Sequence, residues 1–195
     1  MKRIPILPTL LVLVAVGYMI HLGLWQLQRL DEKQAMLARY EGASGSSDLR
    51  IFPDANPAHI EDALYHRSQV DCRFTSGDWE SISGRNDKGD AGYVHVILCG
   101  IQANGTAYVQ AGWSRDPKPP VWNGGVVNGI VAPFHKDGAA RLIADPPLAG
   151  LQANAKPDPR DIPNNHLAYA VQWFLFAGVA LVIYALALRK RMRAG

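Results

Sequence analysis

Two long stretches of the chain contain only uncharged and mostly apolar residues. They run over Ile4–Leu24 and Leu167–Leu188, are 21 and 22 residues long, and contain no Asp, Glu, Lys or Arg. About 20 residues of helix are enough to cross the hydrocarbon core of a bilayer. The pattern therefore predicts two transmembrane helices, with about 140 residues between them.

The first apolar stretch continues as an amphipathic helix. Leu24, Leu27, Leu30 and Tyr40 recur at broadly helical spacing with polar residues between them. Turn-forming residues then crowd the segment 42–57, which predicts a loop. Because no small-residue cleavage site follows the long apolar core, we expect a retained anchor rather than a removed signal peptide.

From Tyr65 onward the pattern is typical of β-strands. Five short runs are rich in β-branched and aromatic residues, and Trp79–Ser83 is an additional short candidate. Asn104-Gly105 and Asp137-Gly138 are strong hairpin turn pairs between neighbouring runs. Short strands joined by tight turns predict an antiparallel barrel or sandwich. The five runs are Tyr65–Phe74, Tyr93–Gly100, Thr106–Gly112, Gly125–Ala132 and Ala140–Ala144.

These patterns divide the chain into six segments. We expect an N-terminal transmembrane helix with its exit, a helical extension and loop, an antiparallel β-rich domain, a proline-rich linker, a C-terminal transmembrane helix and a basic tail. The fold class is thus a membrane protein in which two helices flank a small β-domain outside the cytoplasm. In order, the segments cover residues 1–29, 30–64, 65–145, 146–163, 164–189 and 190–195.

Charge predicts the orientation of the two helices. Lys2 and Arg3 precede the first span, and four further cations follow the second within residues 189–193. Without these six, 14 basic and 17 acidic residues remain, so the net charge of +3 comes from the chain ends. Because Lys and Arg collect on the cytoplasmic side of membrane spans, we expect both ends in the cytoplasm. The central domain lacks the basic surface of a nucleic-acid-binding protein, so no nucleic-acid partner is expected.

The central segment lacks the common catalytic motifs. It contains no Gly-x-Ser-x-Gly, no phosphate loop and no His-Glu-x-x-His. A membrane-anchored enzyme would need titratable groups that only folding brings together. Cys72 and Cys99 are the only cysteines, and they leave two interpretations open: a disulfide outside the cytoplasm, or two buried free thiols.

His166 begins a pattern on the second span. Tyr169 and Trp173 follow at +3 and +7, so the three side chains share nearly one face of the helix, with alanines beside them. An imidazole next to flat aromatic rings, with space around it, can ligate haem iron and pack against the porphyrin. A belt of His, Tyr and Trp at the lipid headgroups explains the same residues, and Trp25 on the first span as well.

His21 lies near the outer end of the first span. At 1.5 Å of rise per residue it reaches a depth similar to that of His166. A pair of histidines, one from each span, is therefore a second arrangement that the sequence allows.

Several stretches together resemble one protein family. Pro163–Phe174, with the sequence PNNHLAYAVQWF, closely resembles the second-span signature of the Surfeit locus protein 1 family, which assists assembly of haem-copper cytochrome oxidase. Gly23–Leu30 is similar to the family's first-span exit, Gly92–Val96 to its central strand, and Gly112-Trp113 to its Gly-Trp strand end. The proline-rich stretch 147–159 precedes the second span as in bacterial members.

The resemblance implies an accessory protein of oxidase assembly rather than an enzyme. It implies haem a as a transient cofactor, with His166 at the haem iron and Trp173 as its companion; the helix face adds Tyr169. Ala111 departs from the family, whose members usually carry arginine before Gly-Trp, and His21 is outside the family pattern. Motif residues at the membrane boundary are Trp25, Gln26, Arg29, Asn165 and Gln172.

The implied setting is the bacterial inner membrane, with the central domain on the periplasmic side. The implied partners are cytochrome c oxidase subunit I, haem a synthase and membrane lipid. One hypothesis is a chaperone that binds haem a at the outer membrane boundary and aids its insertion into subunit I. The alternative is a structural scaffold that holds an early assembly intermediate without binding haem.

Overall fold

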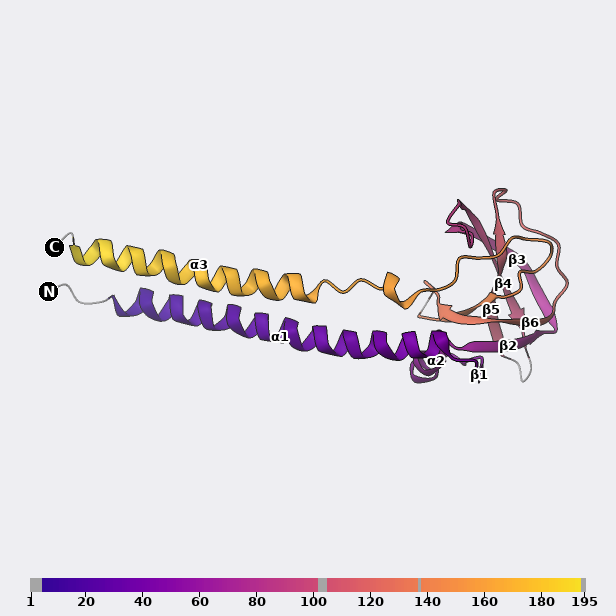
Figure 1. Cartoon of the computed structure of the whole chain (residues 1–195), viewed down its shortest axis with the longest axis horizontal. Helices are drawn as coiled ribbons and strands as arrows, with labels where there is room; N and C mark the ends of the chain where they lie inside the picture. Colours follow the sequence, from indigo (N-terminus) through magenta and orange to yellow (C-terminus); the bar gives the residue numbers. More distant parts are fainter. Residues whose placement is uncertain (1–4, 102–104, 137, 194–195) are drawn as a thin grey trace. The chain divides into compact units, whose positions relative to one another are not determined.

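The computed structural model describes residues 5–101, 105–136 and 138–193, and the chain divides into two compact units. One unit combines Met1–Leu37 with Ile162–Gly195, and the other is Ala38–Asp161. The first consists of two long helices, and the second of the last turns of one of these helices together with a β-sheet and short helices (Figure 1).

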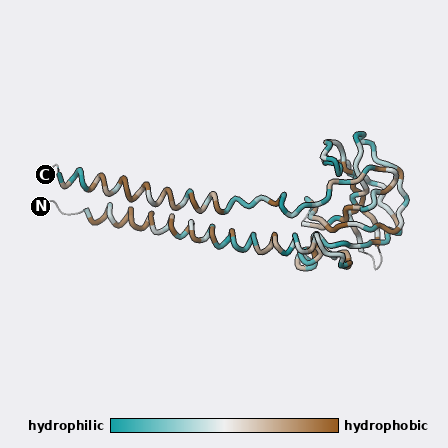
Figure 2. Tube along the Cα trace, in the orientation of Figure 1, coloured by the Kyte–Doolittle hydropathy of each residue, from teal (hydrophilic) through white to brown (hydrophobic). Residues whose placement is uncertain are grey.

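The two long helices are α1, Ile6–Gly45, and α3, His166–Arg193. Both are long and apolar enough to cross a membrane, and few side chains of their apolar parts are buried. Figure 2 shows apolar residues along α3 and the N-terminal half of α1, with more polar residues in the later turns of α1. The prediction of two membrane-spanning helices that flank a β-rich domain is confirmed.

The second unit is built on one seven-stranded sheet with the order β1-β2-β6-β7-β5-β4-β3. Two short helices accompany it, α2 (Pro57–Ala63) and the 3-10 helix η2 (Pro159–Asp161). The strands are β1 (Leu49–Ile51), β2 (Arg67–Cys72), β3 (Phe74–Arg85), β4 (Ala91–Gly100), β5 (Thr106–Ser114), β6 (Gly125–Pro133) and β7 (Ala140–Ala144).

The sheet is mixed, whereas the sequence favoured a wholly antiparallel one. Strands β4–β5 and β6–β7 pair antiparallel, as the turn pairs predicted, although Asn104 and Asp137 themselves lie outside the described residues. Strand β1 pairs parallel to β2, with α2 in the connection between them. Strand β7 pairs parallel to β5, and the β6–β7 hairpin lies between β2 and β5 in the sheet. Such crossovers depend on contacts between distant segments, which local patterns do not indicate.

Three elements differ from the sequence expectation in extent. The segment 42–57, expected as loop, contains the end of α1 and the edge strand β1. The candidate strand at 79–83 is the centre of β3, the longest strand, with an irregularity between Thr75 and Trp79. Gly77 has φ +77° at that irregularity, a conformation that glycine adopts without strain.

A disulfide joins Cys72 at the end of β2 to Cys99 in β4, with 5.4 Å between their Cα atoms. This resolves the alternative that the sequence left open. One residue further, the Arg73 amide donates to the Gly100 carbonyl (3.0 Å), and β3 begins at Phe74. The end of β2, the second strand of the sheet order, is thus joined to β4, the second strand from the other end, and the sheet curls round a buried interior that includes Val109, Val131 and Leu142.

The proline-rich linker is bound to the sheet, and it turns where the Leu151 amide donates to the Leu148 carbonyl (2.9 Å). Its amides at Leu148 and Gln152 donate to the carbonyls of Ala111 and Trp113, at 2.8 and 3.0 Å. Ala155 donates to Arg85 in the same manner (3.0 Å). Residues up to 155 are thus fixed by backbone hydrogen bonds to β3 and β5, and only the short remainder precedes α3.

Candidate functional site

Helices α1 and α3 pack against each other as an antiparallel pair. Residues later in α1 contact residues earlier in α3. The contacts join Thr9 to Tyr184, Gly23 to Phe174 and Gln26 to His166. The interface is therefore a narrow seam that runs along both helices and ends near the first turn of α3.

Small residues form the centre of this seam. Ala170 and Ala177 of α3 are only 1% and 4% exposed, and Val16 of α1 is 5% exposed. Gly23 is buried as well, and a Cβ atom there would lie 2.6 Å from Cε1 of Phe174. The sequence suggested that the alanines beside His166 leave room for a cofactor. In the structure these alanines are instead covered by α1.

His166 is bonded to Gln26 at the end of the seam. Its Nδ1 lies 2.8 Å from Oε1 of Gln26, and both side chains are half-buried. An amide oxygen only accepts, so Nδ1–H is the donor. Within the described chain, Nε2 of His166 has no hydrogen-bond partner, and in the neutral ring it carries the lone pair that a metal ligand needs.

Exposed aromatic rings lie on one flank of the helix pair. Each residue turns a helix by 100°, in opposite senses for two antiparallel helices seen from one end. On α3 this rotation places Tyr169, Trp173 and Phe176 on the same side of the seam as His166, whereas Phe174 lies on the other side against Gly23. We call these three residues the aromatic flank; Tyr18 and Trp25 are exposed on the face of α1 that is turned away from α3.

Of the aromatic flank, Trp173 is closest to the seam and half-buried, and its ring meets Phe176 edge-on at 6.1 Å between centroids. The other two rings, of Tyr169 and Phe176, are about half exposed. Tyr169 and Trp173 were named from the sequence, whereas Phe176 was missed. The available signal was the i, i+7 spacing of Tyr169 with Phe176.

The other boundary residues have separate positions. His21 is exposed and points about 140° around α1 from Gln26, so the structure does not pair it with His166. Arg29 forms an exposed ion pair with Glu32 on the same helix. Asn165 accepts the first helical hydrogen bond of α3 through its carbonyl (3.2 Å from the Tyr169 amide), and Gln172 is exposed on the side of α3 away from α1.

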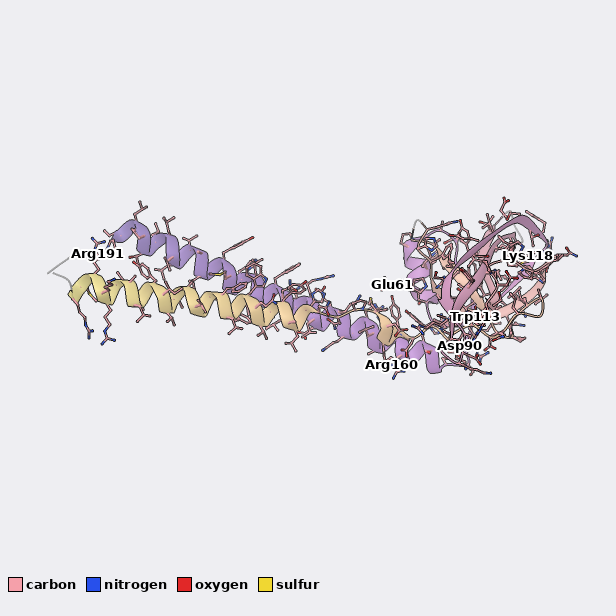
Figure 3. All side chains as sticks on the ribbon, turned by 90° about the horizontal axis from the view of Figure 1, so that it is seen from above. Glu61, Asp90, Trp113, Lys118, Arg160 and Arg191 are labelled. Carbon is pink, nitrogen blue, oxygen red and sulfur yellow. A yellow bond between two sulfur atoms is a disulfide. The ribbon has the colours of Figure 1, made fainter. Side chains whose placement is uncertain are left out.

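The motif residues of the β-domain serve packing. Trp113 is 1% exposed within the sheet unit (Figure 3), and a Cβ on Gly92 would lie 2.4 Å from its ring. A Cβ on Gly112 would lie 2.5 Å from Cβ of Leu151 in the linker. Both glycines are therefore needed for close approach, one to an indole ring and the other to the linker.

His95 is fully buried and hydrogen-bonded at both ring nitrogens. Its Nδ1 lies 2.9 Å from the hydroxyl of Ser81, and its Nε2 lies 2.8 Å from the hydroxyl of Ser114, which donates to the Asp116 carbonyl. Nε2–H is therefore a donor. Burial lowers the pKa of His95, against an opposing effect of Asp116. Both ring nitrogens of His95 are bonded to serine hydroxyls and not to a carboxylate side chain, whereas the histidine of a catalytic triad requires a carboxylate partner.

Among the residues that the structure describes, no group of three or more His, Cys, Asp or Glu side chains could hold a metal ion. A protein-bound metal site made of several such ligands is therefore not found in that part of the chain. Ligation through the single imidazole of His166 is a different chemistry, in which the porphyrin supplies the other ligands.

Two membrane-spanning helices, with a sheet domain between them in the sequence and one imidazole held at the end of the helix seam, define a membrane-anchored β-domain protein. The SURF1 family model matches residues 13–178, and the chain belongs to this family. The family is associated with cytochrome c oxidase assembly and is a family of assembly factors rather than of known enzymes. The comparison with curated proteins gave no match.

Proposed function

We propose that the protein is a chaperone of cytochrome c oxidase assembly, which binds haem a through His166 at the outer boundary of the membrane and aids its insertion into subunit I. The observation that supports this proposal most directly is the hydrogen bonding of the His166 imidazole. Its Nδ1–H is bonded to Gln26, and its Nε2 has no partner within the described chain. A ligating histidine in proteins commonly has this arrangement.

The aromatic flank supports haem as the ligand. Tyr169 and Trp173 follow His166 on α3, on the same side of the seam. Flat rings at the lipid boundary offer apolar surface to a porphyrin, and the surrounding lipid accommodates the long apolar tail of haem a, which is costly to expose to water. Because the alanines of the seam are already covered by α1, the flank is the surface on which we place the porphyrin.

A single exchangeable ligand suits a protein that must release its cargo. His21 points away from His166, so the described helices do not offer a second histidine that would lock the iron. We propose haem a synthase as the donor and subunit I as the acceptor, with membrane lipid around the helix pair. The protein itself catalyses no step in this proposal.

We place the β-domain on the periplasmic side of a bacterial inner membrane. The disulfide between Cys72 and Cys99 supports this, because disulfides persist outside the reducing cytoplasm. Lys190, Arg191 and Arg193 in the last turn of α3 support a cytoplasmic C-terminus. A reporter enzyme that is active only in the periplasm, inserted after the exposed Val121, is expected to be active; an inactive but expressed fusion would contradict the orientation.

The test is an absorption spectrum of the full chain, purified in detergent after co-expression with the haem a biosynthetic enzymes. We expect about one haem a per wild-type protein and none in His166→Ala. His21→Ala is the matched control, because this histidine belongs to the same helix pair but to another face, and it should keep the haem. A folded wild type without haem, or a His166→Ala variant with full occupancy, would contradict the proposal.

A scaffold without haem is the second candidate. It is favoured by the coverage of Ala170 and Ala177, which use the small-residue face for helix packing. Gln172 on the opposite side of α3 is exposed and available to a partner helix. Under this hypothesis, Gln172→Leu weakens co-purification with subunit I, whereas His166→Ala has no effect on it.

A further inference from the structure

The hydrogen bond between Gln26 and His166 determines which ring nitrogen of His166 carries the proton. A neutral histidine carries its proton on either Nδ1 or Nε2, and only the bare nitrogen can bind a metal. Nδ1 of His166 lies 2.8 Å from Oε1 of Gln26, a group that can only accept. In the neutral ring the proton is therefore on Nδ1, which leaves Nε2 bare.

We infer that Gln26 is a positioning residue, which holds His166 in the Nδ1–H tautomer and orients its Nε2 for haem iron. This inference rests on the proposed function for its ligand, but its first step concerns the apo-protein alone. Gln26 does not touch iron; it acts through the imidazole, as the carbonyl and carboxylate partners of metal-binding histidines do.

The chemical nature of the partner matters for a carrier. A carboxylate that accepts from Nδ1–H makes the imidazole more basic and its bond to a metal stronger. The neutral amide of Gln26 fixes the same tautomer without placing a negative charge beside the ring. We therefore expect an amide here to give ligation that is specific in geometry and still reversible.

The position of Gln26 depends on its neighbours in the seam. Gly23, one turn earlier, faces the ring of Phe174 so closely that a Cβ atom would lie 2.6 Å from Cε1. Without a side chain at residue 23, α3 approaches α1, and the amide and the imidazole come within hydrogen-bond distance. The contact thus depends on the seam as well as on the two bonded residues.

The test uses the full chain in detergent, labelled with ¹⁵N-histidine, before haem is added. The signals of His166 are assigned by their loss in His166→Ala. In the wild type, we expect the shifts of a protonated Nδ1 and a bare Nε2. Gln26→Met, which has a similar length and no acceptor, should give a mixture of the two tautomers, and Gln26→Glu should keep the wild-type tautomer.

Gln28→Met is the matched control, since Gln28 is on the same helix and bonds Glu32 at 3.2 Å instead of His166. It should leave the His166 signals unchanged. If Gln26→Met also leaves them unchanged in a protein that elutes as the wild type does, the inference is overturned.

The same variants are then titrated with haem a. We expect Gln26→Met to weaken binding by about tenfold or more, and Gln26→Glu to bind at least as tightly as the wild type and to lower the reduction potential of the bound haem. Equal affinity of Gln26→Met and wild type, with altered tautomers, would overturn the role in ligation. A wild type that binds no haem a while its tautomer responds to Gln26→Met would instead contradict the proposed function, so the two failures are distinguishable.

Discussion

The helix pair and the β-domain use their family-motif residues in different ways. In the β-domain, Gly92 and Gly112 allow close packing, and Trp113 fills the interior. In the helix pair, His166 and Gln26 form a half-buried polar contact with one ring nitrogen left unpartnered within the described chain. The first set of residues serves the packing of the fold, and the second keeps a chemical capacity that the fold does not use.

This difference indicates where function is concentrated. His95 and His166 are both histidines within family motifs, but His95 is fully buried with two hydroxyl partners, and its lone pair is occupied. Only His166 combines a fixed tautomer with an available nitrogen and exposed aromatic rings nearby. The β-domain therefore serves as a stable body, and the helix pair provides the proposed ligand site.

Loss of the disulfide should have the largest effect on the β-domain. Replacement of Cys72 and Cys99 by alanine opens a link between residues 27 positions apart, and we expect a loss of about 3–4 kcal/mol in the free energy of unfolding. Chemical denaturation followed by circular dichroism measures this. The β-domain and the helix pair are separate compact units, so we expect His166 to keep its tautomer in this variant. A changed tautomer would show that the stability of the β-domain affects the helix pair.

Gly92→Ala should be the next largest perturbation. The new Cβ would lie 2.4 Å from Cζ2 of Trp113 and 2.7 Å from the backbone oxygen of Ser114, so we expect a loss of about 1–3 kcal/mol from overpacking. Gly42→Ala in α1 has no heavy atom within 4 Å and should instead stabilise the helix by up to about 1 kcal/mol. Equal denaturation midpoints for the two variants would disprove the close packing of Gly92 against Trp113.

Gly23→Ala should act on the helix pair alone. The methyl group meets Phe174, moves α3 away from α1 and lengthens the bond between Gln26 and His166. We expect haem a affinity to fall by up to about tenfold, with an unchanged unfolding transition of the β-domain. Gly17→Ala, for which no atom lies within 4 Å, should change neither property. Equal haem a titration curves for both variants would disprove the dependence on close helix approach.

The pH dependence of stability should be the mildest effect. Burial lowers the pKa of His95 below its ordinary 6.5, so the unfolded chain binds more protons than the folded one as the pH falls below about 6.5. The free energy of unfolding should therefore be highest above that pH and decrease towards acid. His95→Gln should remove this decrease between about pH 6.5 and 5; a variant with the wild-type slope would show that His95 is not its source.

The sequence predicted those features that depend on local patterns. The two uncharged stretches predicted α1 and α3, because lipid selects for apolar residues along a whole helix. Residue spacing placed His166 and Trp173 on nearly one face of α3. The turn pairs in the sequence that end at Gly105 and Gly138 predicted the hairpins β4–β5 and β6–β7.

Features that join distant segments were beyond local patterns. The parallel pairing of β5 with β7, the bridge between Cys72 and Cys99, and the bond from Gln26 to His166 each depend on how the chain returns to itself. For the same reason, Ala170 was associated with free space, although α1 covers it. His21 and His166 lie at similar depth in the two spans, but the rotation of each helix about its axis decides which residues meet, and it brings Gln26 to His166.

The most direct test is the haem a content of the purified full chain beside two histidine variants. We predict about one haem a per wild-type protein, the same for His21→Ala, and none for His166→Ala. Haem a retained by His166→Ala at the wild-type level, or absent from a folded wild type, would contradict the central claim that the imidazole bonded to Gln26 is the ligand.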